Sequence, residues 1–229
     1  MASTYNLAEL GDLPVPPREN LFAAARYMTR LAEANGIAIA LIGGLAMNIR
    51  GSMRDTVDID LVLGARMIDI NAIFRQQPRL VIPNTVTLDN ITKVFVHTGP
   101  KYGDLDCTTN FDVEADVMAE GHWGTPDSIA NHQQHYDVEN LTGHSESFSL
   151  LDLFSAMKAK LYAYQERQAM KDFHDIKFLL DHYGDEVSRF SDKLDESNCS
   201  FLLEKMESME LVTQEEFNRY IEMFGMKPL

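Results

Sequence analysis

Residues 41–63 have the sequence LIGGLAMNIRGSMRDTVDIDLVL, which combines a glycine pair with two closely spaced aspartates. The preceding β-branched run, residues 37–42, predicts a buried strand that ends at the glycine pair. A short helix is expected near residues 45–50, and the alternation in residues 56–63 predicts a second strand. The segment thus predicts a strand, a tight turn, a short helix and a second strand in direct succession.

The two aspartates, Asp58 and Asp60, are separated by one residue on the second predicted strand. Because side chains of a strand alternate between its faces, both carboxylates point the same way, and Val57, Ile59 and Leu61 are expected to be buried on the other face. Neighbouring carboxylates repel each other and lose hydration, and a divalent cation between them removes both costs. Oxygen ligands at this spacing suit Mg²⁺.

The glycine pair, Gly43 and Gly44, would let phosphate oxygens approach the backbone N–H groups at the start of the short helix. An Asp-x-Asp pair alone is weak evidence, because the 229 residues include 19 aspartates, so that about one or two such pairs are expected by chance. Asp104 and Asp106 form another. The distinctive feature is the complete order of strand, glycine pair, helix and aspartate-bearing strand.

The rest of the chain divides into two halves with different patterns. Alternating or β-branched runs are frequent in the first half, and helical spacing dominates the second. The predicted strands lie at residues 80–82, 91–98, 105–108, 111–118 and 136–138, and the predicted helices at residues 18–35, 67–77, 150–183, 196–209 and 214–224. We therefore expect an α/β unit in residues 1–145, followed by a helical unit in residues 146–229.

The composition limits the classes of partner. The net charge of −15, from 20 Lys and Arg against 35 Asp and Glu, provides no bulk basic surface for nucleic-acid phosphates. Residues 101–150 hold ten Asp and Glu and a single Lys, a bias that solubility, bound metal or a cationic substrate would each explain. The chain start lacks the pattern of a signal peptide, and no apolar run is long enough to span a bilayer, so we expect a cytoplasmic protein.

The glycine pair followed by Arg54-x-Thr56-x-Asp58-Ile59-Asp60 resembles the signature of the DNA polymerase β-like nucleotidyltransferase superfamily. The similarity is greatest to the branch of AbiEii-type toxins and small antibiotic-modifying nucleotidyltransferases. The resemblance implies an α/β (α+β) fold in which a mixed sheet with flanking helices precedes a C-terminal helical bundle, with the active site in the cleft between the two. It also implies that the two aspartates bind Mg²⁺ and that the glycine turn, with Arg54 and Thr56, holds a nucleoside triphosphate.

In that family a third carboxylate arrives from a later strand. The segment FDVEADVM, residues 111–118, offers Asp112, Glu114 and Asp116 on one face. Asp116 and the residues up to Gly121 resemble the family's run of strand aspartate, apolar residues and turn glycine. We predict Asp116 as the third carboxylate, with Asp112 as the alternative.

A second resemblance lies in the helical half. Lys160, Arg167 and Lys171 would share one stripe of a single long helix, with Asp172 and Asp175 following. This order resembles the AbiEii-type pattern, in which basic residues reach the triphosphate and the later acids organise the site. The alternative is a solvated helix face whose acids cap a new helix. We predict functional roles for Lys160, Lys171 and Asp172, and a structural one for Arg167.

The resemblance implies transfer of a nucleoside monophosphate from an NTP to an acceptor hydroxyl or phosphate, with release of pyrophosphate. The three aspartates would hold two Mg²⁺ ions, and Lys160, with Arg54 and Lys171, would neutralise charge on the leaving group. The acceptor stays open among a small molecule, RNA and protein, and the acidic stretch suits a polycationic small molecule such as an aminoglycoside. The alternative function is a catalytically silent member of the fold that binds a nucleotide or a partner.

Overall fold

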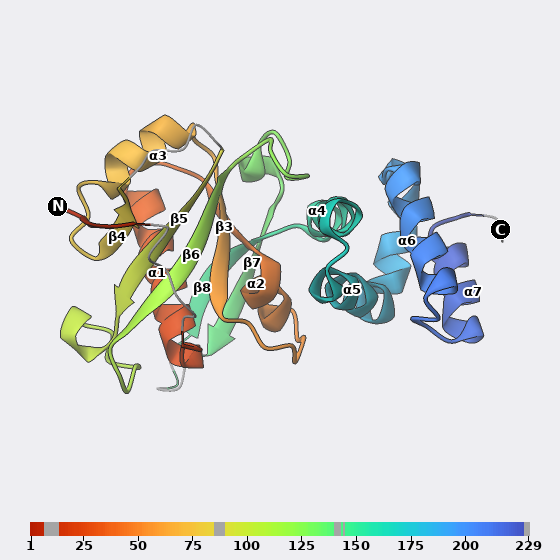
Figure 1. Ribbon diagram of the computed structural model, residues 1–229, viewed down its shortest axis with the longest axis horizontal. Helices are drawn as coiled ribbons and strands as arrows, with labels where there is room; N and C mark the ends of the chain where they lie inside the picture. Colours follow the sequence, from red (N-terminus) through yellow and green to blue (C-terminus); the bar gives the residue numbers. More distant parts are fainter. Residues whose placement is uncertain (7–13, 85–89, 140–142, 144, 227–229) are drawn as a thin grey trace. The chain divides into compact units, whose positions relative to one another are not determined.

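The computed structural model of the protein describes residues 1–6, 14–84, 90–139, 143 and 145–226. The chain divides into two units (Figure 1). The first comprises Met1–His122 and Pro126–Leu151, and the second comprises Trp123–Thr125 and Asp152–Leu229. The boundary that the sequence placed after residue 145 falls inside a strand, and the helical unit begins at Asp152.

The first unit is built on an eight-stranded mixed sheet with the strand order β1-β4-β5-β6-β3-β2-β8-β7. β3 and β6 are parallel neighbours near its centre, and the antiparallel strands β5 and β2 lie outside them. The strands are β1 (Ser3–Tyr5), β2 (Ile39–Ile42), β3 (Asp58–Leu63), β4 (Leu80–Pro83), β5 (Ile91–Thr98), β6 (Phe111–Ala119), β7 (Gln133–Glu139) and β8 (Ser145–Leu151). This central position gives β3 a partner strand on each side, which fixes the direction of its aspartates.

One face of this sheet is buried under helix α1 (Arg18–Ala34), which packs against β2, β3, β5 and β6 (Figure 1). The strand residues between the carboxylates, such as Ile59, Ala115 and Val117, are fully buried. Helix α2 (Gly43–Ile49) connects β2 to β3. The alternation of the strands therefore leaves the aspartates on the face that α1 does not cover.

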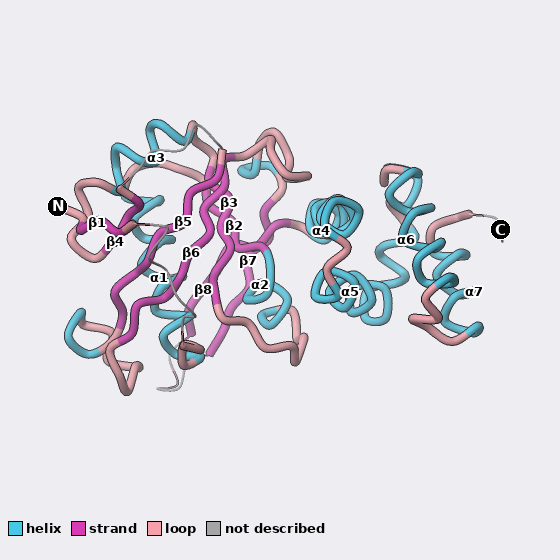
Figure 2. The backbone as a smooth tube through the Cα atoms, viewed as in Figure 1, coloured by secondary structure: helices cyan, strands magenta, loops and turns pink. Residues whose placement is uncertain are grey.

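The remaining helix of the first unit is α3 (Met67–Phe74), and the second unit consists of helices (Figure 2). Its helices are α4 (Leu153–Arg167), α5 (Met170–Ser188), α6 (Glu196–Ser208) and α7 (Gln214–Met223). α4 packs against α5 and α6, and α7 packs against α5 and α6. Large buried side chains such as Tyr164, Phe173 and Tyr220 form the core of this unit.

The predicted fold class is confirmed, and so are most of the predicted elements, but two predicted elements and one predicted burial are wrong, and two strands were missed. Residues 105–108 form a turn, not a strand. The single helix predicted for residues 150–183 is two helices, because Gln168 takes a left-handed conformation with φ of 49°. The strands β1 and β8 were missed, the first because it has three residues and the second because its serines weaken the β pattern. Val57 precedes β3 and is exposed, not buried.

Within the described part of the chain, no helix is both long and apolar enough to cross a bilayer.

Candidate active site

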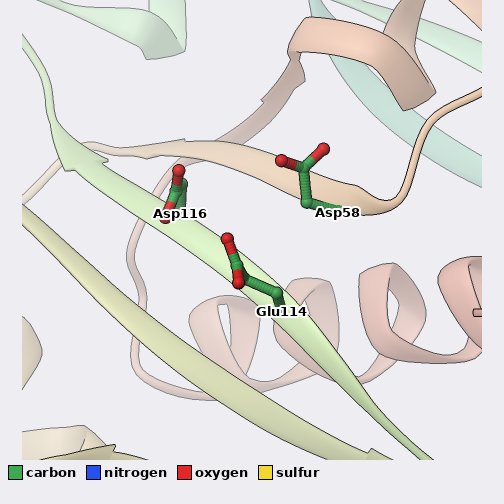
Figure 3. A group of neighbouring side chains, drawn as sticks. All are labelled: Asp58, Glu114 and Asp116. Carbon is green, nitrogen blue, oxygen red and sulfur yellow. The ribbon is translucent and has the colours of Figure 1, made fainter. Parts of the chain in front are cut away.

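Three carboxylates meet across the central pair of strands, and Asp60 lies outside this group of three. The parallel register places Asp58 opposite Glu114, and Asp60 opposite Asp116. One oxygen each from Asp58, Glu114 and Asp116 lies within 4.8 Å of the others. Figure 3 shows these three side chains on the two neighbouring strands. We call these three residues the sheet carboxylate cluster. Two predicted residues, Asp58 and Asp116, thus lie together, and Glu114 joins them.

The donor set of the sheet carboxylate cluster fits a divalent cation. All three side chains offer hard oxygen ligands, which are the ligands that Mg²⁺ prefers, and none is fully buried. Three anionic groups at this separation repel one another unless a positive charge lies among them. The cluster therefore has both the chemistry and the charge surplus that a magnesium site requires.

Asp60 is held against the glycine turn. Gly43 has φ of +64°, and a Cβ built on it would overlap the Asp60 carboxylate. A Cβ on Gly44 would overlap the Thr56 hydroxyl and lie 2.8 Å from Nη2 of Arg54. Both glycines are thus required by side chains of the same site, in addition to any phosphate that they were predicted to admit.

The loop before β3 is ordered by side chains at both of its ends. Asn48 donates hydrogen bonds from Nδ2 to the backbone oxygens of Ser52 (2.9 Å) and Arg54 (2.6 Å). The Thr56 hydroxyl donates to Oδ1 of Asp58 over 3.2 Å. Thr56 therefore orients one carboxylate of the cluster, and Asn48, which the sequence did not single out, fixes the loop that carries Arg54.

A lysine that the sequence analysis missed enters the sheet carboxylate cluster. Lys93 lies on β5 directly opposite Asp116 in the antiparallel register. Its Nζ forms an ion pair with Glu114 and lies 3.2 Å from Oδ1 of Asp116. The signal in the sequence was a lysine inside a β-branched run. To place this lysine beside Asp116, however, the register of β5 against β6 has to be known.

A tyrosine supports this lysine through the backbone. Tyr5 donates a hydrogen bond from its hydroxyl to the backbone oxygen of Lys93 over 3.0 Å. Burial, and then the charge of Asp116, raise the pKa of Tyr5 to about 12. The Tyr5 hydroxyl therefore stays protonated and acts as a donor at neutral pH.

The alternative third carboxylate lies farther along the same strand. Asp112 pairs with His97 through a 2.6 Å contact to Nδ1, and its side chain is 58% exposed. It does not contribute to the sheet carboxylate cluster. The geometry thus brings Asp116, and not Asp112, close to Asp58, and it adds Glu114, which the sequence placed on the same strand face without selecting it.

The predicted residues of the helical half form what we call the helical ion-pair network. Nζ of Lys160 lies 2.7 Å from Oδ2 of Asp175 and 3.3 Å from Oδ1 of Asp172. Nε of Arg167 lies 2.6 Å from Oδ2 of Asp172. Both aspartates are fully buried. Burial raises the pKa of Asp172, but the hydrogen bond from Arg167 and the charges of Lys160 and Arg167 outweigh it, so that the pKa is lowered.

The predicted stripe of basic residues on one long helix is wrong. Arg167 is the last residue of α4, Gln168 ends that helix, and Lys171 lies exposed in the first turn of α5. Lys160 and Asp172 come together through the packing of two helices, so they do not share one helix face. Both belong to the second unit, whereas the sheet carboxylate cluster belongs to the first.

The acidic stretch of residues 101–150 is partly neutralised by arginines from earlier in the chain. Arg79 pairs with Asp104 over 2.6 Å, and Arg26 pairs with both Asp106 and Glu146. Together with the ion pairs of Lys93 and the contact of His97, these interactions account for six of the ten acidic residues. The stretch therefore presents less free negative charge than its composition indicates.

Both the sequence and the fold are similar to those of known proteins. Residues 26–228 match the family described as nucleotidyl transferase AbiEii toxin, type IV TA system. Similar solved structures include an antigenic nucleotidyltransferase-like protein from Paracoccidioides brasiliensis, which is 18% identical with a TM-score of 0.49 over 73% of this chain and 78% of that one. The antibiotic-resistance factor ANT(2'')-Ia is 17% identical with a TM-score of 0.46, over 74% of this chain and 85% of that one.

JHP933 from Helicobacter pylori is 13% identical with a TM-score of 0.46, over 93% of this chain and 91% of that one. No curated protein matches the sequence. The family match extends over both units, from α1 to the end of the helical unit. The predicted family is thereby confirmed: this chain is a nucleotidyltransferase and belongs to the AbiEii toxin family of type IV toxin–antitoxin systems.

Proposed function

We propose that the protein is a Mg²⁺-dependent enzyme that transfers a nucleoside monophosphate from an NTP to a hydroxyl or phosphate of an acceptor and releases pyrophosphate. The observation that carries this proposal is the sheet carboxylate cluster, together with Asp60 beside it on β3. The family to which the chain belongs supports the same reaction class. Asp58, Asp60 and Asp116 are the proposed metal ligands, and Glu114 is an additional one.

In the proposed reaction, the acceptor oxygen forms a bond to the α-phosphorus, and the bond between that phosphorus and the oxygen bridging to the β-phosphate breaks. Two bound Mg²⁺ ions would supply positive charge at the reacting phosphate and the leaving group. Asp116 would accept the proton of an acceptor hydroxyl, and its carboxylate, which is about one quarter exposed, leaves room for that group to approach. Asp58 is oriented by the Thr56 hydroxyl, which limits its freedom to turn away.

Two groups of residues are proposed to contact the nucleotide. Gly43, Gly44, Arg54 and Thr56 form the turn that would hold phosphates in the first unit. Lys160 would neutralise charge on the pyrophosphate, with Lys171 as a second cation and Asp172 positioning Lys160. Arg167, which holds Asp172, keeps its proposed structural role.

The proposed acceptor is a small molecule, an RNA or a protein, and we place the enzyme in the cytoplasm. The neutralisation of the acidic stretch weakens the case for a polycationic acceptor.

A single observation favours a second candidate function, a catalytically silent module that binds a nucleotide or a partner. Lys93 already supplies a cation to Glu114 and Asp116, as a permanent substitute for a metal would.

A thermal-shift panel distinguishes the two functions. ATP, GTP, CTP and UTP are added with and without Mg²⁺ to the wild type, to Asp60→Asn and to Asp112→Asn. Asp112→Asn is the matched control, because it removes a carboxylate from the same sheet face outside the cluster. At about a hundredfold excess over Kd, a ligand of the folded state stabilises it by about 2.7 kcal/mol.

We expect one nucleotide to raise the melting temperature of the wild type and of Asp112→Asn only when Mg²⁺ is present, and to leave Asp60→Asn unchanged. A shift that needs no Mg²⁺ and survives in Asp60→Asn would identify the silent binding module. If none of the four nucleotides shifts the wild type, the proposed transfer from an NTP is wrong.

A further inference from the structure

Lys93 contacts two of the three members of the sheet carboxylate cluster. Its Nζ pairs with Glu114 and lies 3.2 Å from Oδ1 of Asp116. Its side chain is about one third exposed, so the ammonium has a path to solvent. The contact depends on β5, which neither carries a metal-ligand candidate nor belongs to the recognised motif.

The ammonium and a divalent cation would use the same carboxylate oxygens. Each gains from the negative charge of Glu114 and Asp116, and the two cations would repel each other at this distance. Two positive ions that need the same ligands bind in competition. The lysine side chain is a compact charge on a flexible stem of four carbons, so it can leave the carboxylates while β5 stays in place.

We propose that Lys93 is an internal competitor for the metal site: its ammonium holds Glu114 and Asp116 until a divalent cation displaces it, and it thereby sets the affinity of the site. This inference rests on the proposed function, because it takes the sheet carboxylate cluster to be the metal site. A lysine and a metal ion can then use the same carboxylates, because the metal ion displaces the lysine when it binds. The lysine stabilises the three carboxylates when no metal is bound, and it weakens the binding of free metal.

Two effects of opposite sign follow for Lys93→Met. The metal-free protein loses the cation among its carboxylates, so its melting temperature falls. The divalent cation no longer has a competitor, so it binds more tightly and raises the melting temperature of the variant by more than that of the wild type. A lysine with a purely structural role would lower the melting temperature without tightening metal binding.

The experiment titrates Mn²⁺ alone, without nucleotide, into the metal-free wild type and its variants, followed by isothermal calorimetry and by thermal shift. Lys93→Gln accompanies Lys93→Met, because its amide can still donate to Asp116 and preserve the fold if the methionine variant does not. Lys101→Met is the matched control, since it removes an exposed lysine from the same unit. Asp58→Asn shows whether the measured Mn²⁺ lies in the cluster.

We expect Lys93→Met and Lys93→Gln to bind Mn²⁺ about tenfold more tightly than the wild type, within the usual range of coupling between competing ligands. Lys101→Met should bind as the wild type does. If Asp58→Asn weakens binding but both Lys93 variants bind as the wild type or more weakly, the competition is wrong and the metal site stands. If Asp58→Asn binds Mn²⁺ as well as the wild type, the metal site and the competition are both wrong.

Discussion

The sheet carboxylate cluster and the helical ion-pair network contain the same kinds of side chain, but they differ in exposure and in charge balance. The first has three carboxylates, two of which pair with one ammonium, and its members are partly exposed. The second has two aspartates with Lys160 and Arg167, and both aspartates are fully buried. One set has a surplus of negative charge that an external cation can neutralise, whereas the other is balanced within the protein.

A binding site and a structural ion pair respond differently when one charged partner is removed. A buried and balanced set loses stability when one partner is removed, because the remaining charge is left without compensation. An exposed set with surplus charge becomes easier to fold when one carboxylate is removed, because a repulsion disappears. Lys160 holds α4 and α5 together through its ion pairs, and it is also proposed to act in catalysis.

The largest expected effect comes from breaking the helical ion-pair network at its shared member. Asp172→Asn leaves Lys160 and Arg167 with one fewer anion, and we expect the free energy of unfolding to fall by about 3 kcal/mol. Asp58→Asn in the sheet carboxylate cluster should leave the metal-free protein unchanged or more stable. Urea unfolding of both variants without metal measures the contrast.

If Asp172→Asn and Asp58→Asn lose the same stability without metal, the distinction between a structural network and a cation site is wrong. The distinction is also wrong if Asp172→Asn keeps the stability of the wild type, because the network would then not be structural. Addition of Mg²⁺ and nucleotide sharpens the contrast, since the response to these ligands should be absent in Asp58→Asn.

The sequence predicted which acidic side chains share a face within each of the two central strands. The alternation of β3 placed Asp58 and Asp60 on one face, and the parity of β6 placed Glu114 and Asp116 together. Which residue of β6 comes closest to Asp58 depends on a register between strands more than 50 residues apart, which alternation within one strand does not determine. Lys93 was missed for the same reason, because its neighbours lie on another strand.

The helical half was predicted less well, because a single backbone conformation changed the arrangement. The spacing of Lys160, Arg167 and Lys171 indicated one stripe only if the helix continued through Gln168. Gln168 has φ of 49°, although left-handed helix ends usually carry Gly or Asn. The break turns the chain so that α5 packs back on α4, and Asp172 and Asp175 then surround Lys160.

A glycine substitution of intermediate effect tests whether the turn at Gly43 holds the Asp60 carboxylate beside the sheet carboxylate cluster. Gly43→Ala places a methyl group on a residue with φ of +64° and against the Asp60 carboxylate. Gly36→Ala is a matched control, because Gly36 has φ of +66° and nothing within 4 Å of the new Cβ. The backbone cost of about 1 kcal/mol is common to both variants, so their difference measures the contact with Asp60.

We expect Gly43→Ala to lose about 1 kcal/mol more stability than Gly36→Ala, as an overpacked site does. It should also lose the Mg²⁺-dependent response to nucleotide, because Asp60 has to move. Urea unfolding and the thermal-shift panel measure the two effects. Equal losses in both variants would show that the glycine serves the backbone turn alone and that Asp60 does not depend on it.

The smallest expected effect concerns a third set of charges, which is partly exposed. Lys177 on α5 donates hydrogen bonds to Asp181 (2.8 Å) and to Glu216 on α7 (2.7 Å). Glu216 also closes the capping box of α7 by accepting from the backbone N–H of Thr213. These hydrogen bonds, first from Lys177 and then from Thr213, lower the pKa of Glu216 to about 2.

Because the folded state lowers this pKa, the carboxylate stabilises the protein above its ordinary pKa of 4.5 and loses that contribution as the pH falls toward about 2. Glu216→Gln should therefore lower the free energy of unfolding by about 1 kcal/mol or less at pH 7, as an exposed pair does. The difference from the wild type should shrink below pH 4.5. Urea unfolding at pH 7 and pH 3 measures it, with Glu215→Gln as the control at the adjacent exposed position.

A loss at pH 7 as large as that of Asp172→Asn would mean that burial does not distinguish these charged sets. A loss that is equal at pH 7 and pH 3 would assign the effect of Glu216 to its shape in the capping box and not to its charge. The expected result, a small loss confined to the higher pH, would leave burial as the property that makes the helical ion-pair network structural. Charge surplus would then remain the property that marks the sheet carboxylate cluster as a site for a cation.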